Sequence, residues 1–166
     1  MRKAAVLMGS DSDWKTMEAA VKTLKEFQVP VEAHVMSAHR TPEASGIFAR
    51  QAREQGFGVI ICAAGMAAHL AGAIAGQTVL PVIGVPIGGG ALSGMDALLA
   101  TVQMPPGVPV ATVGIDAARN AALLAVQMLA LEEPKLFDAL AAYKKNIAEQ
   151  VAAKDLDISE KARALT

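Results

Sequence analysis

The sequence predicts an α/β fold, in which one parallel sheet of about five strands lies between two layers of helices. Short apolar segments alternate with segments of helical periodicity along the whole chain. Residues 55–95 contain no Asp, Glu, Lys or Arg, which is typical of parallel strands buried on both faces. The length of 166 residues suits one domain, since domains commonly run to about 100–200 residues. We therefore expect a single three-layer αβα domain over residues 1–166, of flavodoxin-like or Rossmann-like type.

The first half of the chain predicts two strand–helix units. Residues 4–8 form an apolar strand, and residues 31–35 alternate as a half-buried strand does. The helix between them places apolar side chains at helical spacing: Trp14, Met17, Val21 and Leu24. The next helix is expected from residue 42 to about residue 55, because Thr41 is a good N-cap and Pro42 suits the first helical position.

The second half continues the same alternation. Strands are expected at residues 59–63, 82–85 and 110–113. Ala64-Gly65 is expected to lead into a helix that runs through Ile74. Further helices are expected over residues 95–102 after a glycine-rich segment, from about residue 117 to 131, and from near Pro134 onward. Residues 155–166 are charged and Ala-rich, and we expect a peripheral tail that either reaches a neighbouring subunit or frays.

Composition excludes several classes of function. Fifteen basic and sixteen acidic residues give a net charge of −1, which does not support nucleic-acid binding. Residues 59–76 are long and apolar enough for a membrane span, but they contain His69 and several glycines and lack basic flanks. Cys62 is the only cysteine, so no disulfide scaffold forms and we expect a reduced, cytoplasmic setting. The first strand begins almost at once, which we expect to leave no room for a signal peptide.

Hydrophobic residues make up 53% of the chain and aromatic residues only 4%. Small and aliphatic side chains of this kind suit tight helix packing. The surplus indicates either helix faces that are buried between subunits or a well-filled α/β core.

A cluster of small polar residues follows the first strand, at residues 9–13 (GSDSD). Two hydroxyls, free backbone N–H groups and a helix N-terminus suit a phosphate, and Asp13 could accept hydrogen bonds from a ribose diol. The alternative is a turn with an N-cap, for which Ser and Asp are the usual residues. The segment matches neither the P-loop nor the G-x-G-x-x-G dinucleotide motif.

A histidine and an arginine follow the second strand, within residues 37–42 (SAHRTP). They lie on a strand-to-helix turn at the carboxyl edge of the sheet, where open α/β proteins bind ligands. His39 is a candidate general acid/base, and Arg40 is a permanently charged donor suited to phosphate. The alternative is that His39 caps the turn.

Small residues follow the third strand, at residues 63–70 (AAGMAAHL). They let a ligand approach the backbone, whose N–H groups could hold a carboxylate or a molecule like carbon dioxide. His69 alone is better explained as a hydrogen-bonded core or interface histidine. No spacing of His and Cys predicts a metal site, and no G-x-S-x-G elbow predicts a serine hydrolase.

Several segments, in order along nearly the whole chain, match the motifs of one family: residues 8–14 (MGSDSDW), 37–42 (SAHRTP), 65–70 (GMAAHL), 92–96 (LSGMD), 102–105 (VQMP), 107–110 (GVPV) and 120–125 (NAALLA). Through them the chain resembles the class I 5-(carboxyamino)imidazole ribonucleotide mutases of bacterial purine biosynthesis. The resemblance implies a reversible shift of a carboxylate from the exocyclic nitrogen to the ring carbon of an aminoimidazole ribonucleotide. It also implies carbon dioxide as a trapped intermediate, no metal or other cofactor, and a homo-octamer.

The resemblance implies roles for single residues as well. His39 matches the proton-transferring histidine, while Ser10, Asp13 and Arg40 match positions that bind phosphate and ribose. The expected substrate-binding residues are Ser10, Ser12, Asp13, Ser37, Ala38, Arg40, Ala64, Gly65, Ala67, Ala68, His69 and Leu70.

Three other functions compete with this prediction. The first is the related class II carboxylase, which uses carbon dioxide directly. Enzymes of that class typically carry Lys where this chain has Arg40 and lack the Thr-Pro that follows, so Arg40-Thr41-Pro42 favours the mutase. The second is a flavodoxin-like FMN carrier, for which Trp14 and Tyr143 are the only large aromatic candidates. The third is a receiver module, but the third strand ends in Ala63-Ala64 rather than in a phosphorylatable Asp.

Overall fold

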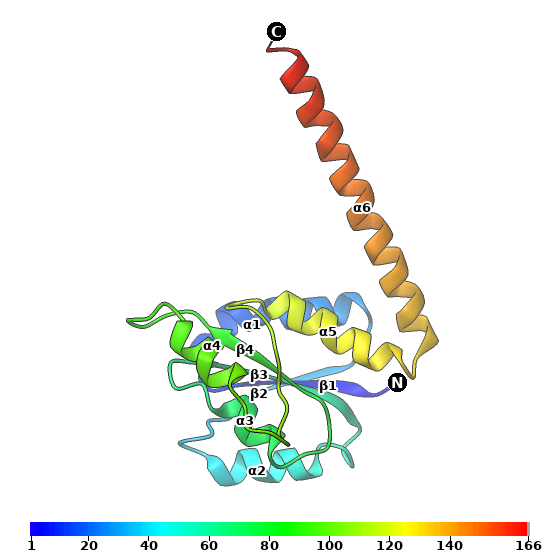
Figure 1. The fold of residues 1–166 in the computed structure, drawn as a ribbon. Coiled ribbons are helices and arrows are strands. Elements are labelled where there is room, and N and C mark those ends of the chain that lie inside the picture. The colour runs from blue at the N-terminus through cyan, green and yellow to red at the C-terminus, as the bar shows by residue number, and fades with distance from the viewer. Residues whose placement is uncertain (166) are drawn as a thin grey trace.

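The computed structural model describes residues 1–165 and confirms the predicted α/β fold (Figure 1). Five parallel strands form one sheet: β1 (Lys3–Met8), β2 (Val31–Val35), β3 (Phe57–Gly65), β4 (Val82–Ile87) and β5 (Ala111–Thr112). Their order across the sheet is β2-β1-β3-β4-β5. This is the flavodoxin-like order, in which the winding direction reverses between β1 and β3 and ligands bind beyond the carboxyl ends of the strands.

Helices cover both faces of the sheet (Figure 1). Helices α1 (Trp14–Glu26) and α5 (Ala118–Ala130) lie side by side on one face, and α2 (Pro42–Gln51) and α3 (Leu70–Ala75) lie on the other. Helix α4 (Met95–Val102) packs against β4, and a short 3-10 helix, η1 (Asp11–Asp13), joins β1 to α1. The long helix α6 (Pro134–Arg163) follows α5 and projects from the domain.

The core consists of two apolar layers, one on each face of the sheet. Ala4, Val6 and Met8 of β1 pack toward α1 and α5, whereas Ala5 and Leu7 pack toward α2 and α3. The side chains divide in this way because successive residues of a strand point to opposite faces. Both sets are apolar because helices exclude water from both faces. The predicted burial of the central strands is therefore confirmed.

The connection from β3 to α3 differs from the prediction. Strand β3 continues through Gly65, which pairs with Ile87 of β4, and α3 begins only at Leu70. The prediction that the strand ends at Ala63 and that Ala64-Gly65 leads directly into the helix is wrong here. The longer strand is possible because β4 runs two residues further than expected and gives Ala64 and Gly65 ladder partners. Residues 66–69 thus form a loop at the carboxyl edge of the sheet.

The expected end of α2 and the capping role of Thr41 are also wrong. Helix α2 ends at Gln51 rather than near residue 55, because the chain turns tightly toward β3 at Gly56, whose φ is +87°. Thr41 is at the N-cap position, but its side chain makes no capping hydrogen bond. Its Oγ1 instead bonds to the backbone of Ser37.

Three further predictions need correction. Strand β2 lies at an edge of the sheet, so only Val31 and His34 are half-buried and the other three residues are exposed. Trp14 is on α1 as expected but is 42% exposed, because it begins the helix beyond the edge of the core. The predicted strand at residues 110–113 is shortened to Ala111–Thr112, which lies at the edge of the sheet and pairs with β4 alone among residues 1–165.

Helix α6 includes most of the residues that were predicted to form a peripheral tail. The chain remains helical through Arg163, so the prediction that it frays is wrong for residues 155–163. Thr166, the last residue of the predicted tail, lies outside the described residues. Leu136 and Leu140, in its first two turns, are buried against the domain, whereas side chains from residue 144 onward are almost all exposed. Within residues 1–165, no helix combines the length and the apolar character needed to cross a membrane.

Candidate functional site

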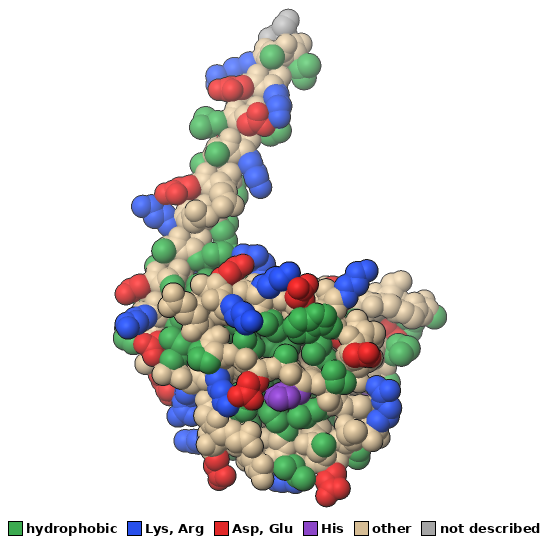
Figure 2. All heavy atoms as spheres, turned by 180° about the vertical axis from the view of Figure 1, so that it is seen from behind, with side chains coloured by type: hydrophobic (Ala, Val, Ile, Leu, Met, Phe, Trp, Pro, Cys, Tyr) green, Lys and Arg blue, Asp and Glu red, His purple; other side chains and the backbone are tan. Residues whose placement is uncertain are grey.

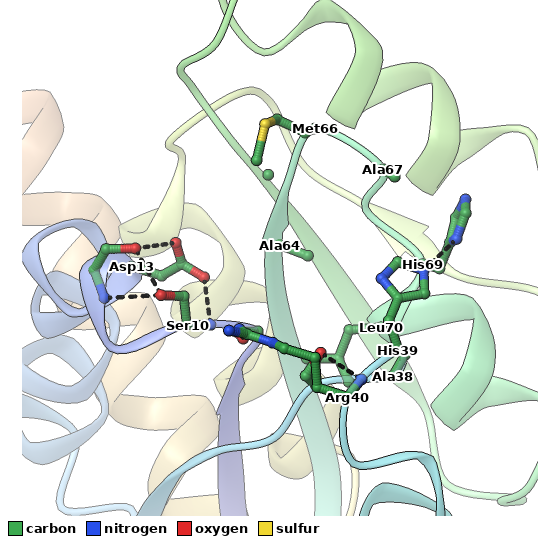
Figure 3. Close-up of a pocket in the computed structure, with 14 residues that line it drawn as sticks. Ser10, Asp13, Ala38, His39, Arg40, Ala64, Met66, Ala67, His69 and Leu70 are labelled. Atoms are coloured by element: carbon green, nitrogen blue, oxygen red, sulfur yellow. Dashed lines mark hydrogen bonds between the residues drawn. The ribbon is translucent and has the colours of Figure 1, made fainter.

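A pocket of about 640 Å³ opens at the carboxyl ends of β1, β2 and β3, at the point where the winding of the sheet reverses (Figure 3). Its volume lies within the usual range of small-molecule sites. It is lined by Gly9, Ser10, Ser12, Asp13, Ser37, Ala38, His39, Arg40, Ala64, Gly65, Met66, Ala67, His69 and Leu70. Three segments that are far apart in the sequence therefore contribute to one cavity.

Every predicted site residue except Ala68 lines this pocket. Ala68 is 2% exposed and its side chain belongs to the interior, next to the first turn of α3. Gly9 and Met66 also line the pocket but were not among the predicted site residues. Their positions directly after β1 and β3 could have identified them, because the carboxyl ends of neighbouring parallel strands meet at one edge.

Ser10 and Asp13 form a reciprocal cap at the start of η1. The Ser10 Oγ accepts a hydrogen bond from the backbone N–H of Ser12 (3.3 Å), and Asp13 Oδ2 accepts one from the backbone N–H of Ser10 (3.2 Å). The turn and N-cap predicted as the alternative are confirmed. The same geometry leaves the hydroxyls of Ser10 and Ser12 2.9 Å apart on the pocket wall.

Burial raises the pKa of the Asp13 carboxyl above its ordinary value. The side chain is buried, and removal from water penalises the charged form. The hydrogen bonds from Ser10 and Ser12 favour the charged form and offset part of this effect, while nearby Asp11 adds to it. A ligand hydroxyl that donates to this carboxylate would replace part of the lost hydration.

Ser37 and Thr41 hold the turn that carries His39 and Arg40. The backbone N–H of Thr41 donates to the carbonyl oxygen of Ser37 (2.8 Å), and the backbone N–H of Ser37 donates to Thr41 Oγ1 (3.0 Å). The Ser37 Oγ accepts a hydrogen bond from the backbone N–H of Arg40 (3.1 Å). Because these groups close the turn, the alternative that His39 caps it is wrong. Arg40 donates from Nη2 to the carbonyl oxygen of Gly9 (2.9 Å), which brings its guanidinium to the side of the pocket formed by β1.

The imidazole rings of His39 and His69 are hydrogen-bonded to each other. The Nε2 of His39 and the Nδ1 of His69 are 2.8 Å apart, and the ring planes are nearly perpendicular at 80°. Both side chains are exposed to the pocket, so His69 is hydrogen-bonded as expected but is not a core residue. Figure 3 shows the other nitrogen of His39 directed toward the side of Ala64, with His69 on the outer side of His39.

Small side chains form the middle of the pocket. Ala64 and Gly65 end β3, and Met66 continues the wall in a left-handed backbone conformation with a φ of +52°. The Met66 side chain is 63% exposed and lies at the rim above Ala64 in Figure 3. A flat ligand can therefore approach the backbone between the Ser10–Asp13 cap and the histidine pair.

The arrangement separates two kinds of chemistry. Hydroxyls, backbone N–H groups and the Arg40 guanidinium gather at one end, which suits an anion such as phosphate. The imidazole of His39 lies toward the other end, within the same cavity, where it can give or take a proton. Among residues 1–165, no three His, Cys, Asp or Glu side chains gather closely enough to hold a metal ion.

Comparison with known proteins shows close relatives. The family described as AIR carboxylase matches residues 3–150. The chain is 53% identical over 164 residues to N5-carboxyaminoimidazole ribonucleotide mutase of Mycobacterium tuberculosis strain H37Rv, covering 99% of this chain and 94% of that protein. It is 53% identical over 147 residues to the mutase of Pyrococcus abyssi, covering 89% of this chain and 84% of that protein.

The fold has counterparts among solved structures. The crystal structure of Treponema denticola PurE superposes with a TM-score of 0.84 at 27% sequence identity. The match covers 92% of this chain and 95% of that chain. The similarity in three dimensions therefore extends over nearly the whole molecule.

Proposed function

Because the chain belongs to the AIR carboxylase family, we propose that it is an N5-carboxyaminoimidazole ribonucleotide mutase of purine biosynthesis. Such an enzyme converts 5-(carboxyamino)imidazole ribonucleotide to 4-carboxy-5-aminoimidazole ribonucleotide. The proposal rests above all on one observation. The candidate proton-transfer group, His39, shares a single pocket with the anion-binding groups of residues 9–13 and with Arg40, across a floor of small residues.

The ribonucleotide is anchored by its phosphate and its sugar. Ser10, Ser12 and Arg40 bind the phosphate, since hydroxyls and a guanidinium are strong donors to phosphate oxygens. Asp13 accepts hydrogen bonds from the ribose hydroxyls. Anchoring at this end leaves the aminoimidazole ring over Ala64 and Gly65, in the same pocket as His39.

The reaction transfers one carboxylate and returns one proton. His39 first gives a proton to the exocyclic nitrogen as the bond between that nitrogen and the carboxylate carbon breaks, which releases carbon dioxide. The small-residue wall from Ala64 to Ala67 keeps the carbon dioxide beside the ring. Carbon 4 of the ring then forms a bond to it, and His39 removes the proton from that carbon. The histidine thus ends in its starting state and the reaction is a net isomerisation.

Confinement of carbon dioxide in the pocket supplies much of the rate enhancement. A molecule held against its acceptor reacts at an effective concentration far above that of dissolved gas. Carbon dioxide remains beside the ring only if water is largely excluded from the pocket. The small side chains of Ala64, Gly65 and Ala67 leave space for a triatomic molecule beside a flat ring.

Carboxylate retention tests this function against its nearest alternative. Substrate that carries ¹³C in its carboxylate is converted in a buffer of unlabelled bicarbonate, and the product is analysed by NMR. A mutase keeps the label, because the carbon dioxide never leaves the pocket. Loss of the label to the bulk pool, with free 5-aminoimidazole ribonucleotide as an intermediate, would favour the class II carboxylase instead.

We also propose that the enzyme works as a homo-octamer in the cytoplasm. Helix α6 carries three exposed apolar residues that recur on one side of the helix: Ile147, Val151 and Ile158. Figure 2 shows hydrophobic side chains along the projecting helix. Leu92, Met95 and Leu99 are exposed on and before α4. A monomer rarely exposes so many large apolar side chains, and subunit contacts would bury them.

Analytical ultracentrifugation tests the assembly. The wild-type chain is expected to sediment as an octamer. The double substitution Ile147→Asp and Val151→Asp places charges on the apolar side of α6 and should dissociate the octamer. The single substitution Ala153→Asp, on the other side of α6, should leave the octamer intact. A monomeric wild-type chain at micromolar concentration, or dissociation by the control alone, would contradict the proposal.

A further inference from the structure

We propose that His69 is a positioning residue that acts through His39 rather than on the substrate. It holds His39 with the proton on Nε2, so that Nδ1 is the only nitrogen that exchanges protons with the ribonucleotide. The inference deepens the proposed function and rests on it. It starts from the 2.8 Å separation of His39 Nε2 and His69 Nδ1.

The hydrogen bond is the main restraint on the orientation of the His39 ring. Both imidazoles are exposed, so the packing of neighbouring side chains does not fix their rotation. The terminal torsion of a histidine is broad, and a ring that is free at this torsion samples a wide range of orientations. The near-perpendicular rings, 4.9 Å between centroids, are not stacked, which leaves the hydrogen bond as the specific contact. The contact also joins two separate segments, the turn after β2 and the loop after β3.

Proton accounting determines which ring donates. Two nitrogens at 2.8 Å share one proton between them. As an acid, His39 carries protons on both nitrogens, so its Nε2–H must donate to a bare Nδ1 of His69. As a base, His39 needs a bare Nδ1, and its remaining proton is again on Nε2. The same hydrogen bond therefore serves both halves of the reaction, and only Nδ1 of His39 changes its protonation.

His69 also stabilises the charged state of His39. When His39 is an imidazolium, its bond to His69 is charge-assisted and stronger than the bond between neutral rings. His69 carries its own proton on Nε2, which is directed away from His39. In serine hydrolases a third group orients the catalytic histidine by the same logic, although there the group is a carboxylate.

The test compares two variants of similar size, His69→Leu and His69→Asn. Leu removes the acceptor, whereas the amide oxygen of Asn occupies a position like that of Nδ1 and can accept from His39 Nε2–H. His69→Leu should lower kcat on the order of 10- to 100-fold with little change in KM, because a hydrogen bond to a charged group contributes a free energy that corresponds to this factor in rate. His69→Asn should recover most of that loss. His34→Asn, on β2 outside the pocket, is the control and should retain wild-type kinetics.

Nitrogen-15 NMR of the ligand-free protein gives a readout that a merely structural role does not change. In the wild type and in His69→Asn, neutral His39 should show a protonated Nε2 and a bare Nδ1, and His69→Leu should show a mixture of tautomers. A wild-type His39 with its proton on Nδ1, or a His69→Leu variant that raises KM and leaves kcat intact, would overturn the inference. If the wild type fails to isomerise the ribonucleotide, the proposed function is wrong, but the NMR signals still report on the histidine pair.

Discussion

Replacing His39 with Asn should stop catalysis while leaving the fold intact. The Asn amide lies near the position of Nδ1 and keeps hydrogen-bonding capacity there, but it cannot give or take a proton near neutral pH. The substitution leaves the turn undisturbed, because Ser37 and Thr41 close that turn through bonds that do not involve the imidazole. His39 is also exposed, so we expect the free energy of unfolding to change by no more than about 0.5 kcal/mol.

Turnover should fall far more than stability. General acid–base groups contribute roughly 10²- to 10⁴-fold to rate, so a loss of at least about 100-fold in kcat is expected. This corresponds to about 2.7 kcal/mol in activation free energy. Initial rates of 4-carboxy-5-aminoimidazole ribonucleotide formation at saturating substrate measure the loss. Calorimetric titration with this nucleotide should give a dissociation constant close to that of the wild type. A kcat within tenfold of the wild-type value would refute the assignment of proton transfer to His39.

Three further predictions concern the rest of the pocket and the core. Arg40→Ala should raise the dissociation constant for the ribonucleotide about 10- to 100-fold with a smaller effect on kcat, since charge-assisted bonds to phosphate are lost; equal affinity in calorimetric titrations would exclude this residue from phosphate binding. Burial raises the pKa of Asp13 in the folded protein, so the folded state favours the neutral carboxyl group. The stability that this group contributes is lost as the pH rises from the unfolded-state pKa of about 3.9 through the folded-state pKa. Asp13→Asn stays neutral, so urea unfolding should show its free energy of unfolding increasing relative to that of the wild type between pH 4 and pH 7, and a flat or falling difference would be inconsistent with this cause. Burial also raises the pKa of the Cys62 thiol, which should react with a disulfide reagent only after unfolding in denaturant, whereas rapid reaction of the native protein would mean that the β3 core opens easily.

Local pattern was enough for much of the fold. The apolar strands at the centre of the sheet and the helices between them follow from periodicity, because the side chains of each element meet one environment along its length. The residues at the carboxyl ends of β1, β2 and β3 were also identifiable, since a parallel sheet brings these ends to one edge. For this reason Ser10, Asp13, Arg40 and His39 could be chosen before any contact was known.

The errors occur where a strand partner or a competing hydrogen bond, rather than the local pattern, decides the outcome. Gly65 belongs to β3 because β4 extends far enough to pair with it, which no property of residues 64–69 reveals. Strand β2 alternates in sequence but lies at an edge, so fewer of its side chains are covered than its pattern suggests. Thr41 stands where an N-cap should, yet a hydrogen bond to Ser37 competes for its hydroxyl.

The amino-acid sequence by itself determined the class of fold, the edge of the sheet at which the pocket lies and the types of side chain available there. These depend on interactions within a few residues or on the common rule that parallel strands end together. Only the tertiary structure decided that His39 and His69, thirty residues apart, share a hydrogen bond, and that Ala68 turns away from the pocket. Such contacts depend on how separate segments are placed to within an ångström, and that placement results from the packing of the whole sheet and its helices.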